Sequence, residues 1–293
     1  MQPTYRFAPS PNGDLHLGHA RSALLNQKLA QAAGGRMLLR IEDVDITRCT
    51  PEFEAAIYAD LAWLGVAWET PVRRQSEHVA DYQAALDRLK GLGLIYPAFM
   101  SRGEMRDHIA ARSDARSPWP RDPDGSPLYP DADRKLSRRE RTRRIASYAP
   151  HAWRLDMHAA VQHAGDDLAW QETGAGPGGE TGTVKARPEI WGDVILARSD
   201  APASYHLAVT VDDALQGVTD VVRGADLFHA TAVHRLLQLL LGLPAPRYHH
   251  HALIAGPDGR KLSKSRGDSG IAALRESRHT ADEVRKMAME GLD

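Results

Sequence analysis

Two short segments far apart in the sequence carry residues suited to nucleotide chemistry. The first, residues 6–20, reads RFAPSPNGDLHLGHA and places His16 and His19 three residues apart, with Gly18 between them. This pattern predicts a strand that ends near Phe7, a turn, and a helix that opens near His16. Residues three apart share one face of a helix, and a helix N-terminus attracts anions. We therefore expect the two imidazoles to donate hydrogen bonds to a nucleotide phosphate.

The second segment, residues 256–268, reads GPDGRKLSKSRGD and combines three glycines with four positive side chains. Lys261 and Lys264 could neutralise the negative charge that builds up on a departing pyrophosphate. A solvated basic turn is the alternative for this segment taken alone. The two segments together favour an enzyme that activates a carboxylate with ATP.

These segments resemble the HIGH and KMSKS signatures of class I aminoacyl-tRNA synthetases, here written HLGH and KLSKS. Two further blocks, LLRIEDVD at residues 38–45 and YHLAVTVDDALQGVTDVVRGADL at residues 205–227, resemble the glutamyl branch of that family. The resemblance covers most of the chain. It implies an α/β fold with a Rossmann-like catalytic domain, an inserted subdomain of the acceptor-binding type, ATP as a substrate, and Mg²⁺.

The length of the chain indicates which members of the glutamyl branch it resembles most. Glutamyl-tRNA synthetases continue after this signature into a helical domain that reads the anticodon, whereas only residues 266–293 follow here, so we expect no anticodon-binding domain. In this the chain resembles the truncated glutamyl-Q tRNA(Asp) synthetases, which implies transfer of L-glutamate to queuosine in the anticodon loop of tRNA(Asp). A compact synthetase that charges a tRNA 3′ end, a ligase that forms an amide with a small amine, and a non-catalytic tRNA-binding paralogue remain alternatives.

Matching motif positions assign residues to ATP. The resemblance implies that the nucleotide is bound by Pro9, His16, Gly18, His19, Lys261, Ser263 and Lys264. Of these, His16, His19, Lys261 and Lys264 are expected to be catalytic. Glycine at position 18 would let the nucleotide approach the backbone closely.

A second set of matching positions is assigned to glutamate: Arg6, Ser10, Glu42, Tyr205 and Arg223. Glu42 would hold the ammonium group, Arg6 would contact carboxylate oxygens, and the guanidinium fork of Arg223 would select the side-chain carboxylate. Ser10 and Tyr205 would supply neutral hydrogen bonds. Structural alternatives exist: Glu42 could pair with Arg40, Arg223 could bridge Asp220 or Asp226, and Tyr205 could belong to the core.

The chain departs from the family at a zinc site. Many relatives hold structural zinc through three cysteines and a tyrosine, whereas the matching positions here are Ala98, Met100, Tyr129 and Asp133. Alanine has no donor atom, and a methionine thioether is a poor zinc ligand. We predict that zinc is absent and that aromatic packing around Tyr96, Phe99, Trp119 and Tyr129 holds this region.

Residues that interrupt helices and strands, together with the spacing of apolar residues, divide the chain into three predicted parts. Residues 1–95 form the first half of the catalytic domain, residues 96–190 form an insertion, and residues 191–293 form the second half with a short helical tail. Helices are expected near residues 52–65, 81–90 and 230–241, with a strand near residues 218–224. The glycine-rich residues 173–183 read as a loop.

Composition indicates a cytoplasmic enzyme, which we expect to be a monomer. No apolar run is long enough to span a bilayer, the N-terminus lacks a secretory pattern, and Cys49 is the single cysteine. The formal net charge of −1 is low for a protein that binds tRNA. Residues 134–144, RKLSRRERTRR, carry seven positive side chains and one glutamate, a pattern that fits an RNA contact or a solvated helix face.

Overall fold

A seven-stranded sheet forms the centre of the molecule, for which a computed structural model describes residues 2–114, 116–254 and 270–291. Its strands lie in the order β3-β2-β1-β9-β10-β6-β7. They span Glu69–Arg74 (β3), Arg36–Ile41 (β2), Thr4–Phe7 (β1), Asp220–Gly224 (β9), Arg247–His251 (β10), Ala169–Glu172 (β6) and Gly182–Lys185 (β7). All neighbouring pairs are parallel except β6 and β7. The order places β1 next to β9, so two distant parts of the sequence meet at the middle of the sheet.

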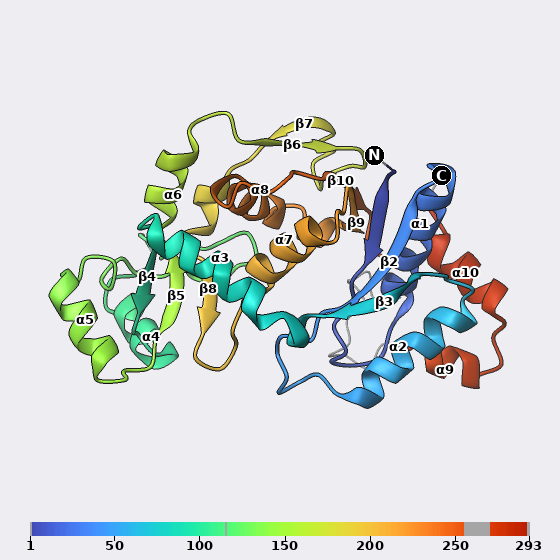
Figure 1. Cartoon of the computed structure of the whole chain (residues 1–293), viewed down its shortest axis with the longest axis horizontal. Coiled ribbons are helices and arrows are strands. Elements are labelled where there is room, and N and C mark those ends of the chain that lie inside the picture. The colour runs from blue at the N-terminus through green and yellow to red at the C-terminus, as the bar shows by residue number, and fades with distance from the viewer. Residues whose placement is uncertain (1, 115, 255–269, 292–293) are drawn as a thin grey trace.

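Helices connect and cover these strands (Figure 1). They are α1 (Leu17–Ala32), α2 (Pro51–Trp63), α3 (Val79–Gly91), α4 (Arg102–Ala110), α5 (Arg138–Ala146), α6 (Met157–Ala164), α7 (Tyr205–Leu215), α8 (Ala230–Leu240), α9 (Ile271–Glu276) and α10 (Ala281–Met289). Three short 3₁₀ helices lie at Gln75–His78, Pro188–Trp191 and Ala225–Leu227. Helix α1 packs on β1, β2 and β9 and also contacts α10, so the C-terminal helix lies against the first helix of the chain.

A smaller antiparallel sheet, in the order β4-β5-β8, lies to one side of the main sheet (Figure 1). Its strands are β4 (Ile95–Ala98), β5 (Ala152–Leu155) and β8 (Ile195–Arg198). Helices α4 and α5 lie beyond it, at the far end of the molecule from α9 and α10. This region lies beside the catalytic sheet and is joined to it through α3 and α7, which contact β4 and β8 respectively.

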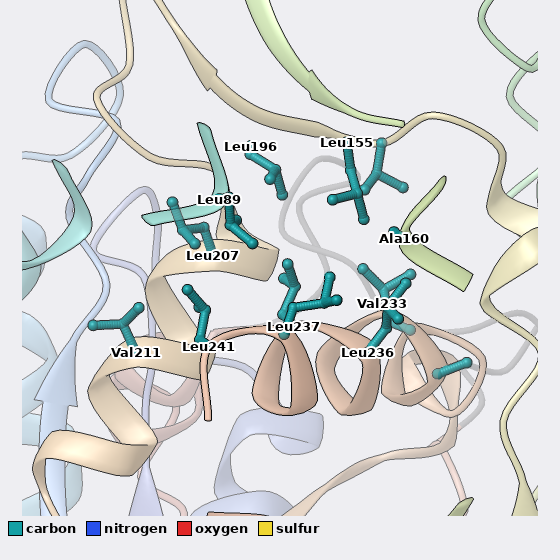
Figure 2. Packing of buried hydrophobic residues seen from close by; sticks show 14 of the residues in the cluster. Leu89, Leu155, Ala160, Leu196, Leu207, Val211, Val233, Leu236, Leu237 and Leu241 are labelled. Atoms are coloured by element: carbon teal, nitrogen blue, oxygen red, sulfur yellow. The ribbon is translucent and has the colours of Figure 1, made fainter. Parts of the chain in front are cut away.

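Two hydrophobic clusters stabilise the fold. One packs α1, α2 and α10 against β1 and β2. The other joins α3, α6, α7 and α8 to the smaller sheet, and Figure 2 shows its centre, where leucines of α7 and α8 face Leu155 and Leu196. Because the second cluster includes residues of both sheets, it fixes the smaller sheet relative to β9 and β10.

Most of the predicted elements are confirmed. The structure has the predicted α/β class, with helices near residues 52–65, 81–90 and 230–241 and a strand at 220–224. Strands β6 and β7 belong to the main sheet although they lie within residues 96–190, and the glycine-rich loop connects them. The division into three parts stays a prediction. No helix in the described ranges is long and apolar enough to cross a membrane.

Candidate active site

A cleft of about 380 Å³ opens where the central strands end. It is lined by residues that directly follow β1 and β2 and by the last residues of β9 and β10. Parallel strands place such residues at one edge of a sheet, which is where α/β proteins bind ligands. Its wall includes Arg6, Pro9, Ser10, His16, Gly18, His19, Glu42, Tyr205 and Arg223. Nine of the predicted site residues therefore surround one cavity.

The N-terminus of α1 presents two imidazoles to this cleft. His16 is the N-cap residue, and its Nδ1 accepts a hydrogen bond from the Gly18 N–H at 3.1 Å. The His19 Nδ1 accepts one from the His16 N–H, also at 3.1 Å, and the two ring centroids lie 3.8 Å apart. Because both Nδ1 atoms act as acceptors, the proton of each neutral ring is on Nε2. Both rings are therefore in the tautomer that donates through Nε2.

Gly18 has an intramolecular reason to be glycine. A Cβ atom at this position would lie 2.9 Å from Cε1 of the His16 ring, closer than side chains normally approach. Gly18 also lines the cleft, which agrees with the predicted close approach of a nucleotide. The glycine therefore makes room for the histidine cap and leaves this part of the cleft wall without a side chain.

A network of buried charged residues supports the part of the cleft wall that contains Arg6 and Glu42. Arg40 has no exposed side-chain surface and contacts Asp213 at 2.7 Å, Glu42 at 3.1 Å and Asp212 at 3.8 Å. Arg6 also pairs with Asp213, through Nε at 3.1 Å. Burial would raise the pKa of Asp213, but the two arginines outweigh burial and hold it below its ordinary value. The network fixes Arg6 and Glu42 at the edge of the cleft.

Glu42 takes part in the buried network and also lines the cleft. Its Oε1 accepts a hydrogen bond from Arg40, which is the structural alternative that the sequence offered for Glu42. Burial raises the pKa of Glu42, while Arg40 and Arg6 oppose that rise. A ligand ammonium group would favour the ionised carboxylate in the same way.

Arg223 is a buried cation whose partners are neutral. It lies on β9 with 4% of its surface exposed, and its guanidinium contacts His250, Tyr205, His234, Thr231 and the Leu227 carbonyl. Within the described part of the chain no carboxylate forms an ion pair with it, and Asp220 pairs with Arg247 instead. Tyr205 is 38% exposed and lines the cleft, so it is not a core residue.

Lys261, Ser263 and Lys264, which we predict to bind ATP, lie outside the described residues. The described residues that flank them lie beside the cleft. His251, Leu253 and Ile254 line it, and Gly270 forms a β-bridge with His16.

Nearly all of the sequence matches a known family. A family model described as tRNA synthetases class I (E and Q), catalytic domain, matches residues 4–292. The chain belongs to this family. Its catalytic domain therefore uses ATP, as the predicted nucleotide signatures require.

Relatives of two kinds resemble this synthetase domain. A glutamyl-Q tRNA(Asp) synthetase of Rhodobacter capsulatus is 44% identical over 286 residues, which are 96% of this chain and 98% of that protein. A glutamate–tRNA ligase 2 of Xanthobacter autotrophicus is 37% identical and is matched over 94% of this chain but 56% of its own length.

A solved structure shows the same fold. A glutamate tRNA ligase from Elizabethkingia meningosepticum, in complex with its amino acid, matches with a TM-score of 0.73 and 29% identity. The match covers 91% of this chain and 53% of that one, so the synthetase domain spans about half the length of the solved enzyme.

The residues at the family's zinc positions are occupied by contacts with one another. The Asp133 carboxylate accepts hydrogen bonds from the Phe99 and Met100 N–H groups, at 2.7 and 3.2 Å, and from the Tyr129 hydroxyl. With Ala98 beside them, these side chains do not form a tetrahedral donor set. Tyr96 is buried as predicted, whereas Phe99, Trp119 and Tyr129 are only half-buried. The absence of zinc stays a prediction.

Magnesium would bind through the nucleotide. No group of three His, Cys, Asp or Glu residues in the described ranges could hold a metal ion. Mg²⁺ often binds through substrate phosphates together with one or two carboxylates, and it would therefore enter the cleft with ATP. Besides Glu42, which pairs with Arg40, Asp226 is a carboxylate at the cleft wall.

Sequence reasoning missed the supporting residues of the synthetase site. Arg40 was considered only as a rival partner of Glu42, and Asp213 lies within a block used for the resemblance. Glu172 and His250 gave no sequence signal, since 78 positions separate them before β6 and β10 bring them together. Contacts of this range depend on the register of the sheet, which a local pattern does not reveal.

Proposed function

We propose that this protein activates L-glutamate with ATP and transfers the glutamyl group to queuosine in tRNA(Asp). The observation that supports glutamate as the amino acid is the pair of charges in the cleft. Arg223 is a buried cation without a carboxylate partner among the described residues, and Glu42 lines the same cleft. An amino acid with an ammonium group and a second carboxylate complements these two charges. The Rhodobacter relative, matched over nearly its full length, supports the acceptor.

Arg223 would contact the side-chain carboxylate by exchanging existing partners. Each of its five N–H groups has an acceptor, and the Tyr205 hydroxyl is the most distant one, at 3.3 Å. A carboxylate entering from the cleft would replace that contact with a charge-assisted hydrogen bond. Glu42 would hold the ammonium group, Arg6 would orient carboxylate oxygens, and Ser10 and Tyr205 would complete the contacts.

In the first step, an oxygen of the glutamate α-carboxylate attacks the α-phosphorus of ATP. The bond from that phosphorus to the bridging oxygen breaks, and pyrophosphate leaves with the electron pair. The Nε2 protons of His16 and His19 are suited to donate to phosphate oxygens during this step. Pro9 and Gly18 would contact the nucleotide, and Lys261, Ser263 and Lys264 would stabilise the pyrophosphate. Mg²⁺ would add charge neutralisation.

In the second step, a hydroxyl oxygen of queuosine attacks the carbonyl carbon of glutamyl-adenylate. The hydroxyl loses its proton, an ester bond forms, and AMP leaves. Binding and orientation account for both steps without a covalent enzyme intermediate. We keep a cytoplasmic location and a monomeric state as predictions.

The first experiment measures ATP–pyrophosphate exchange with each amino acid in the absence of tRNA. Labelled glutamate is then supplied with tRNA(Asp) that contains or lacks queuosine. Glutamate-dependent exchange, followed by labelling of queuosine-containing tRNA(Asp) alone, is expected. Label on the terminal ribose of tRNA(Glu) would instead identify a charging enzyme, and no exchange with any amino acid would identify a non-catalytic paralogue.

Lys264→Ala tests the charge that we assign to the second signature. If Lys264 stabilises departing pyrophosphate, the variant should lower the exchange rate at saturating glutamate by about 100-fold or more, with little change in glutamate affinity. Steady-state exchange kinetics separate the two effects. Equal losses in rate and affinity would contradict this role.

We also infer that the basic helix α5 contacts tRNA. None of its residues is buried, and Arg138 and Arg139 are exposed and form no ion pair with another described residue. Tyr148, just beyond the helix, is 93% exposed and offers a ring on which an unstacked base could rest. Arg143 and Arg144, in contrast, are paired with Glu140. The positive surface offsets the slightly negative net charge of the whole chain.

A further inference from the structure

The guanidinium of Arg223 is held from several elements at once. Its Nε donates to the His250 Nε2 at 3.1 Å, and its Nη1 donates to the His234 Nδ1 at 3.2 Å. Its Nη2 donates to the Thr231 Oγ1 at 2.7 Å and to the Leu227 carbonyl at 3.1 Å. All these acceptors are uncharged, so the partners fix the position of the group without neutralising it.

His250 can accept from Arg223 only in one protonation state. Its Nε2 must carry a lone pair, so the proton of the neutral ring is on Nδ1. That Nδ1 lies 2.6 Å from the Glu172 Oε2, and both side chains are completely buried. An imidazolium would point a second N–H at the Arg223 Nε–H, so the contact is a hydrogen bond from a neutral ring and not an ion pair. Burial, with a contribution from Arg223, lowers the pKa of His250 to about 4 although Glu172 opposes the change.

Glu172 is itself held by the backbone. Its Oε1 accepts from the N–H groups of His250 and Gly174, each at 2.9 Å, and its Oε2 also accepts from the Trp170 indole at 3.3 Å. A Cβ atom on Gly174 would lie 2.3 Å from the His250 carbonyl oxygen, so glycine allows this chain segment to lie directly on β10. The carboxylate therefore has a fixed place beneath the histidine ring.

A second histidine pair approaches Arg223 from α7 and α8. Because the His234 Nδ1 accepts from Arg223, its Nε2 carries the proton and donates to the His206 Nδ1 at 3.1 Å. Burial and the positive charge of Arg223 lower the pKa of both imidazoles, that of His206 to about 4. These rings stay neutral at physiological pH and do not compete with a ligand for the positive charge.

We propose that Glu172 and His250 are positioning residues for substrate selection. Glu172 holds the His250 ring in the tautomer whose Nε2 accepts from Arg223, and this contact aims the uncompensated guanidinium at the side-chain carboxylate of the amino acid. The idea rests on the proposed function for the identity of the ligand, glutamate. Glu172 thereby takes part in amino-acid selection although it lies on β6, a strand that does not line the cleft.

Glu172→Gln tests this role by exchange kinetics. The amide can present N–H to the His250 Nδ1 and so favour the other tautomer, which would turn a donor toward Arg223. The KM for glutamate should rise about tenfold or more, as expected when a hydrogen bond to a charged group is lost. The preference for glutamate over glutamine should fall in parallel. The rate at saturating glutamate and the KM for ATP should stay within about twofold of the unaltered enzyme.

Trp170→Phe is the matched control. It alters another buried side chain of β6 and removes one N–H from the same carboxylate, but it leaves the bond between Glu172 and His250. Its KM for glutamate should stay within about twofold of the unaltered enzyme. If the KM for glutamate rose as much in Trp170→Phe as in Glu172→Gln, any disturbance of β6 would weaken glutamate binding, and the proposal would be overturned.

A double-mutant cycle shows whether Glu172 acts through His250. In the background of His250→Gln, Glu172→Gln should have little further effect on the KM for glutamate, whereas independent, multiplying effects would contradict the proposed relay. If Glu172→Gln fails to fold, the single variant His250→Gln must still raise that KM and lower the preference over glutamine.

Nitrogen NMR of the histidine rings decides the arrangement without any substrate. At neutral pH the unaltered protein should show His250 protonated on Nδ1, and an Nε2-protonated or doubly protonated ring would overturn the positioning role. This readout separates the two proposals. Absence of glutamate-dependent exchange refutes the proposed function, whereas an active enzyme with an unchanged KM in Glu172→Gln refutes the positioning role.

Discussion

Arg40 is the residue on which the charged wall of the cleft depends. It is completely buried and contacts three carboxylates, two of which also pair with other arginines. Removing one member of such a group leaves uncompensated charges in a medium of low dielectric constant. The side chain thus links the stability of the fold to the position of Glu42.

Arg40→Leu should lower the free energy of unfolding by about 3–5 kcal/mol, because the remaining carboxylates lose a buried partner. Denaturant titration measures the change. Arg36→Leu on the same strand is the control, since the Arg36–Glu69 pair is about half exposed and should contribute at most about 1 kcal/mol. Similar losses in the two variants would show that the buried network has no special role.

Helix α5, which we propose contacts tRNA, has no fully buried residue. It is capped by Ser137, whose hydroxyl accepts from the Glu140 N–H, but none of its residues is buried. Local capping and charge pairs help to stabilise it. Its sequence is therefore free to serve a binding partner.

The double variant Arg138→Glu and Arg139→Glu should weaken binding of tRNA and reduce the dependence of log affinity on log salt by about 1 to 2, because fewer counterions are released. Fluorescence titration at several salt concentrations measures both quantities. Exchange without tRNA should not change. An unaltered salt dependence would exclude α5 from the RNA interface, and reversal of the exposed charge of Lys28 on α1 provides a matched control.

The contact between α2 and α9 contains a buried carboxylate. Asp60 is 1% exposed, neither of its oxygens accepts a hydrogen bond from another described residue, and Arg275 lies 3.8 Å away. Burial raises the pKa of Asp60 to about 6, with Arg275 opposing the rise and Asp14 adding to it. The folded protein therefore binds this proton more tightly than the unfolded chain does, and stability falls as pH rises from about 4 to 6.

Asp60→Asn removes this titration. The stability of the variant relative to the unaltered protein should increase by about 2 kcal/mol between pH 4 and pH 7, because the unaltered protein alone carries the cost of a buried charge at the higher pH. Thermal or denaturant unfolding at several pH values measures the difference. A difference that is constant with pH would contradict the raised pKa.

At the scale of the whole molecule, the cleft joins distant parts of the chain. Residues of the first strand and helix meet Tyr205, Arg223 and His251 across the boundary between β1 and β9. A ligand that contacts both sides binds the folded chain and not the unfolded one, so it should stabilise the entire fold.

A non-hydrolysable analogue of glutamyl-adenylate, supplied at about 100 times its Kd, should add about 2.7 kcal/mol to the unfolding free energy. For a chain of 293 residues this corresponds to a rise in Tm of about 4 °C, which differential scanning fluorimetry can follow. The corresponding glutaminyl analogue at the same concentration should give a much smaller rise. Equal shifts would show that the cleft does not recognise the second carboxylate.

The sequence by itself determined the α/β class, the start of α1 at His16, several helices, and the residues that gather around the cleft. The helices follow from local signals such as capping residues, turns and periodicity, whereas the residues around the cleft were assigned from the family resemblance. The roles of Lys261, Ser263 and Lys264 and the division into three parts stay predictions.

Only the tertiary structure decided which strands are neighbours and which charges meet. It placed β6 beside β10 and so brought Glu172 under His250, and it placed Arg40 among carboxylates from β2 and α7. Such contacts depend on strand order and register, which are set when hydrophobic faces pack and not by any short stretch of sequence. The residues that line the cleft were therefore predictable here, and the residues that hold them in place were not.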